Sequence, residues 1–251
     1  NNLAILGLAD AGRQRGRLKV AFSAVEHKSV LGPCRALASS GFEAAVLPVD
    51  SVGRVDAGMY RSAMDDRTLL VAVQAANNEI GTVQDVALLC DLAHETGAAF
   101  HCDAAQAAGK VPINVDAWGV DFLSLSAHKM YGPKGVAALF VRGGLAHSVL
   151  KPLMYGGDQE STLRPGTLNV PLIVGFGEAC RIAAAEIEDD AVRVAQIRDW
   201  FEEQLLSAIP FAKLNGDHNS RLPHNTSLTI PGCDAESLIM SMPEIALSTG
   251  S

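Results

Sequence analysis

The sequence predicts an α/β fold in which a mostly parallel sheet is flanked by helices. Short apolar segments with strand character alternate with amphipathic helical segments along most of the chain. The apolar run over 69–74 is unbroken, which is typical of a strand that is buried on both faces. With 251 residues and 48% hydrophobic content, the chain can bury a large core.

The elements of the first third follow from this alternation. We predict a helix at the N-terminus, a strand over 19–24, a helix over 29–40, a strand over 44–48 and a short helix over 57–64. Gly41 follows the second helix, and glycine commonly ends helices because it tolerates left-handed backbone. Pro33 lies early in that helix, where proline is best tolerated.

The middle of the chain continues the same pattern. Thr82 to Asp85 has a spacing like that of a capping box, which predicts a helix that begins there and stops at Gly97. A strand then ends at Asp103, a crossover occupies 110–119, and strands follow over 121–126 and 136–141.

The last third predicts a second, smaller unit. The Gly-rich polar segment 156–169 is too long for a plain connection, and long ordered loops are often functional. Two helices over 171–188 and 191–208 precede a strand over 226–230 and a helix over 235–242. We therefore expect a large domain over residues 1–186 and the beginning of a small α+β domain over residues 187–251.

Composition excludes several classes of function. The 28 acidic and 20 basic residues give a net charge of −8, which argues against nucleic acid or an anionic membrane as the main partner. No apolar run is long enough to span a bilayer, so a cytoplasmic location is the default expectation. The five cysteines are widely spaced and include no Cys-x-x-Cys pair, which predicts neither a disulfide framework nor a metal site.

Functional side chains follow two neighbouring strands of the predicted sheet. Asp103 and Gln106 come at the end of one strand, and His128 and Lys129 follow the next. Because parallel strands that are neighbours end at the same edge of a sheet, and ligands bind at that carboxyl edge, these side chains are expected to face one small molecule.

These residue types are the parts that a pyridoxal phosphate site requires. Lys129 can form an imine with the cofactor aldehyde, and Asp103 can keep the pyridine nitrogen protonated, which makes the ring an electron sink. Gln106 can donate to the ring phenolate oxygen. Ser126 and His128 can bind the phosphate, a dianion that needs several donors.

Two further residues lie at the same predicted edge. His27 comes just past the first strand and can lay its imidazole over the cofactor ring, although a lone histidine at a helix start is usually a solvated cap. Asn78 also follows a strand and can contact substrate or cofactor, although asparagines at strand exits are ordinarily turn residues.

Together these motifs resemble the cysteine desulfurases, a group of fold-type-I pyridoxal phosphate enzymes within the class V aminotransferases. The resemblance extends nearly end to end and is carried by five segments: Glu26-His27-Lys28, 77–84 (NNEIGTVQ), 101–106 (HCDAAQ), 126–135 (SAHKMYGPKG) and 163–169 (LRPGTLN).

The resemblance implies a role for each matched residue. His27 stacks on the ring, Asn78, Asp103 and Gln106 hold its polar atoms, and Lys129 forms the imine. Ser126 and His128 bind the phosphate, together with Thr167 from the other subunit of a homodimer. The implied reaction converts L-cysteine to L-alanine and leaves the sulfur as a persulfide on an enzyme cysteine, which passes it to a protein acceptor or scaffold for iron–sulfur or thio-cofactor synthesis.

The departures from the family pattern lie at the two ends and at Asp158, which stands where the family usually has a glycine. The chain ends at Ser248-Thr249-Gly250-Ser251, where a segment carrying the nucleophilic cysteine is expected, and the family's N-terminal phosphate-binding turn would precede Asn1. We therefore expect the sequence to be truncated at both ends. Two alternatives remain open: a selenocysteine lyase or other class V enzyme, and a catalytically incomplete fragment or scaffold.

Overall fold

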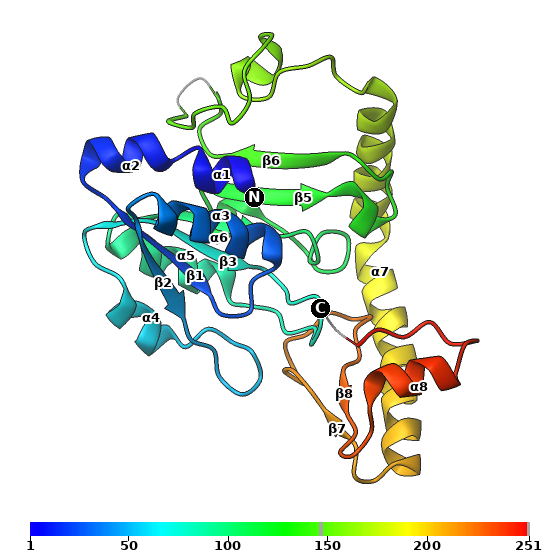
Figure 1. Ribbon diagram of the computed structural model, residues 1–251. Helices are drawn as coiled ribbons and strands as arrows, with labels where there is room; N and C mark the ends of the chain where they lie inside the picture. Colours follow the sequence, from blue (N-terminus) through cyan, green and yellow to red (C-terminus); the bar gives the residue numbers. More distant parts are fainter. Residues whose placement is uncertain (146–147, 250–251) are drawn as a thin grey trace.

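The computed structural model describes residues 1–145 and 148–249 (Figure 1). Its main feature is a six-stranded sheet with the order β2-β1-β3-β4-β5-β6. The first five strands are parallel, and β6 is antiparallel to β5. The predicted mostly parallel sheet is confirmed by these strands: β1 (Lys19–Ser23), β2 (Glu43–Leu47), β3 (Thr68–Gln74), β4 (Ala99–Asp103), β5 (Phe122–Ser126) and β6 (Ala137–Val141).

Helices cover both faces of the sheet. Alternate residues of β3 point to opposite faces, so that Val71 and Val73 belong to one apolar core and Leu70 and Ala72 to the other. The first core is completed by α4 (Ala57–Ala63), α5 (Val86–Glu95) and α6 (Val115–Trp118), and the second by α1 (Asn2–Leu6), α2 (Ala9–Arg15) and α3 (Lys28–Ser39). The buried central strand was predicted from its unbroken apolar run.

The start of α5 differs from the prediction. Asp85, not Thr82, is the N-cap residue, because its carboxylate accepts a hydrogen bond from the Leu88 N–H at 3.2 Å. The Thr82 hydroxyl instead donates to the Val52 carbonyl oxygen at 2.6 Å. The capping-box interpretation was therefore wrong, although the helix itself was correct.

The C-terminal part is built around one very long helix. The two helices expected over 171–188 and 191–208 form a single helix, α7 (Val170–Ala208), and Figure 1 shows it along one side of the molecule. Beside its far end lie the antiparallel pair β7 (Lys213–Leu214) and β8 (Leu228–Thr229), and α8 (Ala235–Ser241). The boundary between residues 186 and 187 stays a prediction, and it falls inside α7.

Two further features belong to the described chain as a whole. Within residues 1–145 and 148–249, no helix combines the length and the apolar character that crossing a bilayer requires. Gly250 and Ser251, at the end of the segment where the nucleophilic cysteine was expected to follow, lie outside the described residues.

Candidate active site

A cavity of about 980 Å³ opens at the carboxyl ends of β3, β4 and β5. It brings together residues that lie far apart in the sequence. Of the eight predicted site residues, seven line it: His27, Asn78, Asp103, Gln106, Ser126, His128 and Lys129. Thr167 is exposed and is not among the lining residues.

Asp103, the last residue of β4, is held in a fixed orientation. Its Oδ1 accepts a hydrogen bond from the Ala105 N–H at 2.9 Å, and its Oδ2 accepts one from Asn1 Nδ2 at 2.6 Å. The residue is 7% exposed and lines the cavity, so its carboxylate faces the cavity and has little contact with bulk water. A buried carboxylate in this setting can bind a cationic ring nitrogen.

Lys129 lies in the short 3-10 helix η1 (Ala127–Met130), which directly follows β5. Ala127 and Met130 are buried and anchor this turn, whereas Lys129 is exposed and lines the cavity. Among the described residues its ammonium group has neither a hydrogen bond nor an ion pair. The structure therefore presents an unpaired lysine side chain on a turn with buried anchors, and its amine form is the nucleophile that a covalent reaction with an aldehyde requires.

Ser126 and His128 flank Lys129 and contact each other. The Ser126 hydroxyl lies 2.9 Å from His128 Nδ1, within hydrogen-bond distance. This contact orients both side chains at the cavity wall. A hydroxyl and an imidazole at the same wall are suitable donors for a phosphate group.

His27 is the N-cap residue of α3, and its tautomer follows from its contacts. Its Nδ1 accepts hydrogen bonds from the Ser29 N–H at 3.2 Å and from the Ser29 hydroxyl at 2.8 Å. A ring nitrogen that accepts a backbone N–H carries no proton, so the neutral ring is protonated at Nε2. His27 therefore keeps its N–H available for a ligand.

A hydrogen-bonded chain connects His27 with Asp103. Asn1 Nδ2 donates to Asp103 Oδ2 at 2.6 Å and to the Ser29 hydroxyl at 2.7 Å, and that hydroxyl donates to His27. Sequence reasoning missed Asn1 and Ser29. Ser29 had a recognisable signal, because it stands two residues after an N-cap, where a backbone N–H meets the cap side chain. Asn1 had none.

His101 lies beneath the cavity and is completely buried in β4. Burial lowers the pKa of His101 to about 3. Its Nε2 is 3.0 Å from the hydroxyl of Ser124, a residue that lines the cavity. The ring is therefore a neutral support for the floor of the site.

The loop expected to be functional does border the cavity. Within 156–169, the residues that line it are Glu160, Leu163, Arg164, Leu168 and Asn169. Glu160 to Thr162 have φ values of 49°, 55° and 67°, in the left-handed region that costs energy for residues other than glycine. Asn78 and Gln106 line the same cavity and make no side-chain hydrogen bond within the described residues, so their amide groups are free to bind a ligand.

The set of donors fits pyridoxal phosphate. This cofactor needs an amine for its aldehyde, a carboxylate for its ring nitrogen and several donors for its phosphate, and Lys129, Asp103, Ser126 and His128 meet those needs. The buried Asn1 Oδ1, which lacks a hydrogen-bond partner in the structure, leaves one further acceptor at the same wall. No group of metal-ligating side chains occurs in the described ranges.

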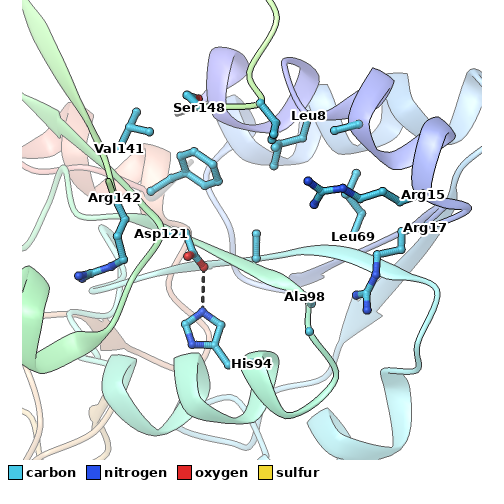
Figure 2. Close-up of a pocket in the computed structure, with 15 residues that line it drawn as sticks. Leu8, Arg15, Arg17, Leu69, His94, Ala98, Asp121, Val141, Arg142 and Ser148 are labelled. Atoms are coloured by element: carbon cyan, nitrogen blue, oxygen red, sulfur yellow. Dashed lines mark hydrogen bonds and ion pairs between the residues drawn. The ribbon is translucent and has the colours of Figure 1, made fainter. Parts of the chain in front are cut away.

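A second cavity, of about 410 Å³, lies at the opposite edge of the sheet, near the amino ends of β3, β4 and β5 (Figure 2). Most of its polar groups already have protein partners. Arg17 donates to the carbonyl oxygens of Thr68 at 2.7 Å and Thr96 at 3.0 Å, and His94 Nε2 is 2.8 Å from Asp121. These contacts fasten strand ends and helix ends, so we assign the chemistry to the larger cavity.

None of the five cysteines lines the larger cavity. Cys34, Cys90 and Cys102 are buried, and burial raises the pKa of Cys34 and of Cys90 to about 12. The pKa of Cys102 is also well above its ordinary value for the same reason. Reactive thiols need a lowered pKa and access to solvent, which these three lack.

Comparison with known proteins identifies the family of the chain. The Aminotransferase class-V family matches residues 1–251. The chain is 40% identical to "Cysteine desulfurase IscS" of Ehrlichia chaffeensis over 251 residues and 42% identical to "Cysteine desulfurase, mitochondrial" of Arthroderma benhamiae over 252 residues. It is covered completely in both matches, but it spans only 61% and 50% of those proteins.

Solved structures give the same result for the fold. A "NifS-like protein" superposes with a TM-score of 0.91 at 33% identity, covering 97% of this chain and 66% of that one. DndA from Streptomyces lividans superposes with a TM-score of 0.85 at 38% identity, covering 97% and 68%. Since the family matches the chain from its first residue to its last, this protein belongs to the class V aminotransferases, a family of pyridoxal phosphate-dependent enzymes with the fold-type-I architecture.

Proposed function

We propose that the full-length protein is a pyridoxal phosphate-dependent cysteine desulfurase, which converts L-cysteine to L-alanine. The observation that carries the proposal is the free amine of Lys129 in one cavity with the fixed carboxylate of Asp103. This choice of substrate is supported by the names of the relatives at about 40% identity and by a solved neighbour described as "SspA in complex with cysteine".

Each side chain has a task in this proposal. Bound pyridoxal phosphate supplies an electron sink for the α carbon of an amino acid. Asp103 orients the ring nitrogen, Asn78 and Gln106 hold polar atoms of the ring, and Ser126 and His128 hold the phosphate. Lys129 Nζ would hold the cofactor through its aldehyde and would serve as the base that moves a proton at the substrate α carbon, while His27 Nε2 would hold a proton on the cavity side.

The sulfur step balances without an external oxidant. The C–S bond of cysteine breaks, an S–S bond forms to an enzyme thiol, and the thiol proton balances the new C–H bond of alanine. Because the cysteines of this chain lie outside the cavity, we propose that the acceptor thiol belongs to a part of the protein outside this sequence. The further proposals are a homodimer with Thr167 in the partner's cavity, a protein acceptor or scaffold for iron–sulfur or thio-cofactor synthesis, and a cytoplasmic location.

The test is turnover by the full-length protein. We expect equal amounts of alanine and, with a reducing thiol present, sulfide from L-cysteine, and a loss of at least about 100-fold in Lys129→Ala. Lys134→Ala, a change in the same segment at a residue that does not line the cavity, is the matched control and should stay active. Release of alanine from selenocysteine but not from cysteine would identify the selenocysteine lyase instead, and no release from either would refute the proposal.

A further inference from the structure

Glu26 is a buried carboxyl group directly behind His27, and the proposed chemistry does not use it. It is 6% exposed. Its Oε1 accepts hydrogen bonds from the Ser23 hydroxyl at 2.5 Å and from the Gln74 N–H at 2.7 Å. Its Oε2 is buried and has no hydrogen-bond partner in the structure. One oxygen is therefore fully used, and the other has no donor to stabilise a negative charge.

The turn that carries His27 is fastened to the end of β3 by three bonds. Besides the bond from the Gln74 N–H to Glu26, Gln74 Nε2 donates to the Val25 carbonyl oxygen at 2.5 Å, and Asn77 Nδ2 donates to the same oxygen at 3.1 Å. The position of His27 is thus set by β3 and not by β1 alone.

The same strand end is also fixed relative to Asp103. Gln74 is paired with Asp103 in the register of β3 and β4, and the Ala75 N–H donates to the Asp103 carbonyl oxygen at 2.8 Å. Glu26 therefore connects the turn that carries His27 to strands β3 and β4, and β4 carries the Asp103 carboxylate.

The surroundings of Glu26 favour its neutral form. Asp103 on β4 is the charged group that acts on it, and Glu26 in turn raises the pKa of Cys34 on α3 and of Cys102 on β4, so no cation faces it among these groups. Burial is the largest cause and Asp103 adds to it, so the pKa of Glu26 rises to about 8 despite the hydrogen bonds from Ser23 and Gln74. A neutral carboxyl also spares Asp103 a second negative charge nearby.

We propose that Glu26 is a positioning residue for His27. Its neutral carboxyl accepts hydrogen bonds from Ser23 and Gln74, which hold the 24–27 turn against the end of β3 and so fix the position of the His27 imidazole relative to Asp103. The inference rests on the proposed function only in taking His27 to lie over the cofactor ring. The turn and the hydrogen bonds that Glu26 accepts are present in the chain whatever the substrate is.

The experiment compares Glu26→Gln with Glu26→Ala in the full-length protein. Glutamine keeps an oxygen that can accept from Ser23 and Gln74 and has no charge to lose. Alanine removes the carboxyl that accepts these two hydrogen bonds and leaves only the two bonds to the Val25 carbonyl oxygen. Glu188→Gln is the control, because Glu188 is exposed on α7. The first readout is hydrogen exchange of the Gln74 amide and of residues 24–27, followed by the affinity for pyridoxal phosphate.

We expect Glu26→Ala to speed this exchange and to weaken cofactor binding by about 10-fold each, and Glu26→Gln to stay within about 2-fold of wild type. Exchange and affinity unchanged in Glu26→Ala would overturn the inference. A wild-type protein that binds cofactor but releases no alanine would refute the proposed function and leave the exchange result standing.

A second readout covers the case in which Glu26→Ala does not fold. Because the native state keeps the Glu26 proton up to about pH 8 and the unfolded state loses it near pH 4.5, the free energy of unfolding of the wild type should fall between these values relative to Glu26→Gln. Glu188→Gln should follow the wild type. If the free energies of unfolding of wild type and Glu26→Gln differ by a constant amount across this range, Glu26 is ionised in the native state. That result would overturn the proposal of a neutral carboxyl.

Discussion

Polar residues at the carboxyl edge of the sheet restrict one another's conformations. His27 is held from the cavity side by Ser29 and from behind by the turn that Glu26 fastens. Asp103 shares the Asn1 amide with Ser29, so the residue proposed to bind the ring nitrogen and the residue proposed to lie over the ring, His27, belong to one network. Such a network costs little on ligand binding because its side chains are already ordered.

His101 gives this edge of the sheet a measurable dependence on pH. Its pKa is lowered to about 3 by burial, whereas a histidine in the unfolded chain protonates near 6.5. As the pH falls from 6.5 towards 3, the unfolded state gains a proton that the native state does not. The free energy of unfolding therefore decreases as the pH falls through this range. The limiting slope for one such group is about 1.4 kcal/mol per pH unit.

We therefore predict that His101→Gln removes this acid sensitivity. The free energy of unfolding of the wild type, followed by denaturant titration, should fall relative to His101→Gln between pH 6.5 and 5. Exposed His218 supplies the control, and His218→Gln should keep the wild-type slope. Parallel pH profiles for wild type and His101→Gln would contradict the prediction. Since Glu26 acts in the opposite direction between pH 4.5 and 8, the two groups offset each other between pH 4.5 and 6.5.

At the scale of the elements, the sequence predicted strands more reliably than helix ends. The strands are short, apolar and bounded by polar residues, and β1, β3 and β5 lie within a residue or two of their predicted limits. The start of a helix depends on which side chain accepts a hydrogen bond from a free N–H of the first turn. Threonine and aspartate are both common N-cap residues, so Thr82 and Asp85 were both candidates. Only the tertiary bond from Thr82 to the Val52 carbonyl oxygen decides between them.

The sequence predicted two helices where the structure has the single helix α7, and the reason is again local. Asp189 and Asp190 have low helix propensity and resemble a helix start, but each costs only about 0.7 kcal/mol in a helix interior. No glycine or proline occurs within 178–208, and Arg193 pairs with Asp190 at 2.6 Å on the same helix face. A continuous helix is therefore more favourable than a break, which would leave about eight backbone groups unsatisfied.

Proline at position 191 tests this continuity. In the interior of one helix, Ala191→Pro should destabilise the protein by about 3 kcal/mol or more, because proline removes a hydrogen bond and clashes with the preceding turn. If a second helix began at Ala191, proline would occupy its first position, where it is well tolerated. Thermal and denaturant unfolding measure the difference, with Ala191→Gly expected at about 1 kcal/mol. A loss below that of the glycine variant would contradict the single helix.

At the scale of the whole molecule, the site was largely predictable, because seven of its residues stand at strand ends that parallel topology brings together. Asn1 and Glu26 could not be predicted from pattern, since their roles depend on which buried atoms happen to face them. Thr167 is different again. It is exposed and outside the cavity of its own chain, and the resemblance assigns it to the cavity of a partner.

A pair of inactive variants tests whether Thr167 acts across a homodimer. In a mixed dimer of Lys129→Ala with Thr167→Glu, the cavity of the Thr167→Glu subunit would contain its own Lys129 and an intact Thr167 from its partner. The other cavity would carry both defects. If Thr167 acts in trans, co-expressed and doubly purified mixed dimers should therefore recover about half of the wild-type alanine release, since one of two equivalent sites is intact. If it acts within its own chain, every site in the mixture carries one defect, and the mixed dimer should be as inactive as the separate variants. Glutamate is chosen because a negative charge in a phosphate site repels the ligand, so that Thr167→Glu alone is expected to lose cofactor affinity in the full-length protein.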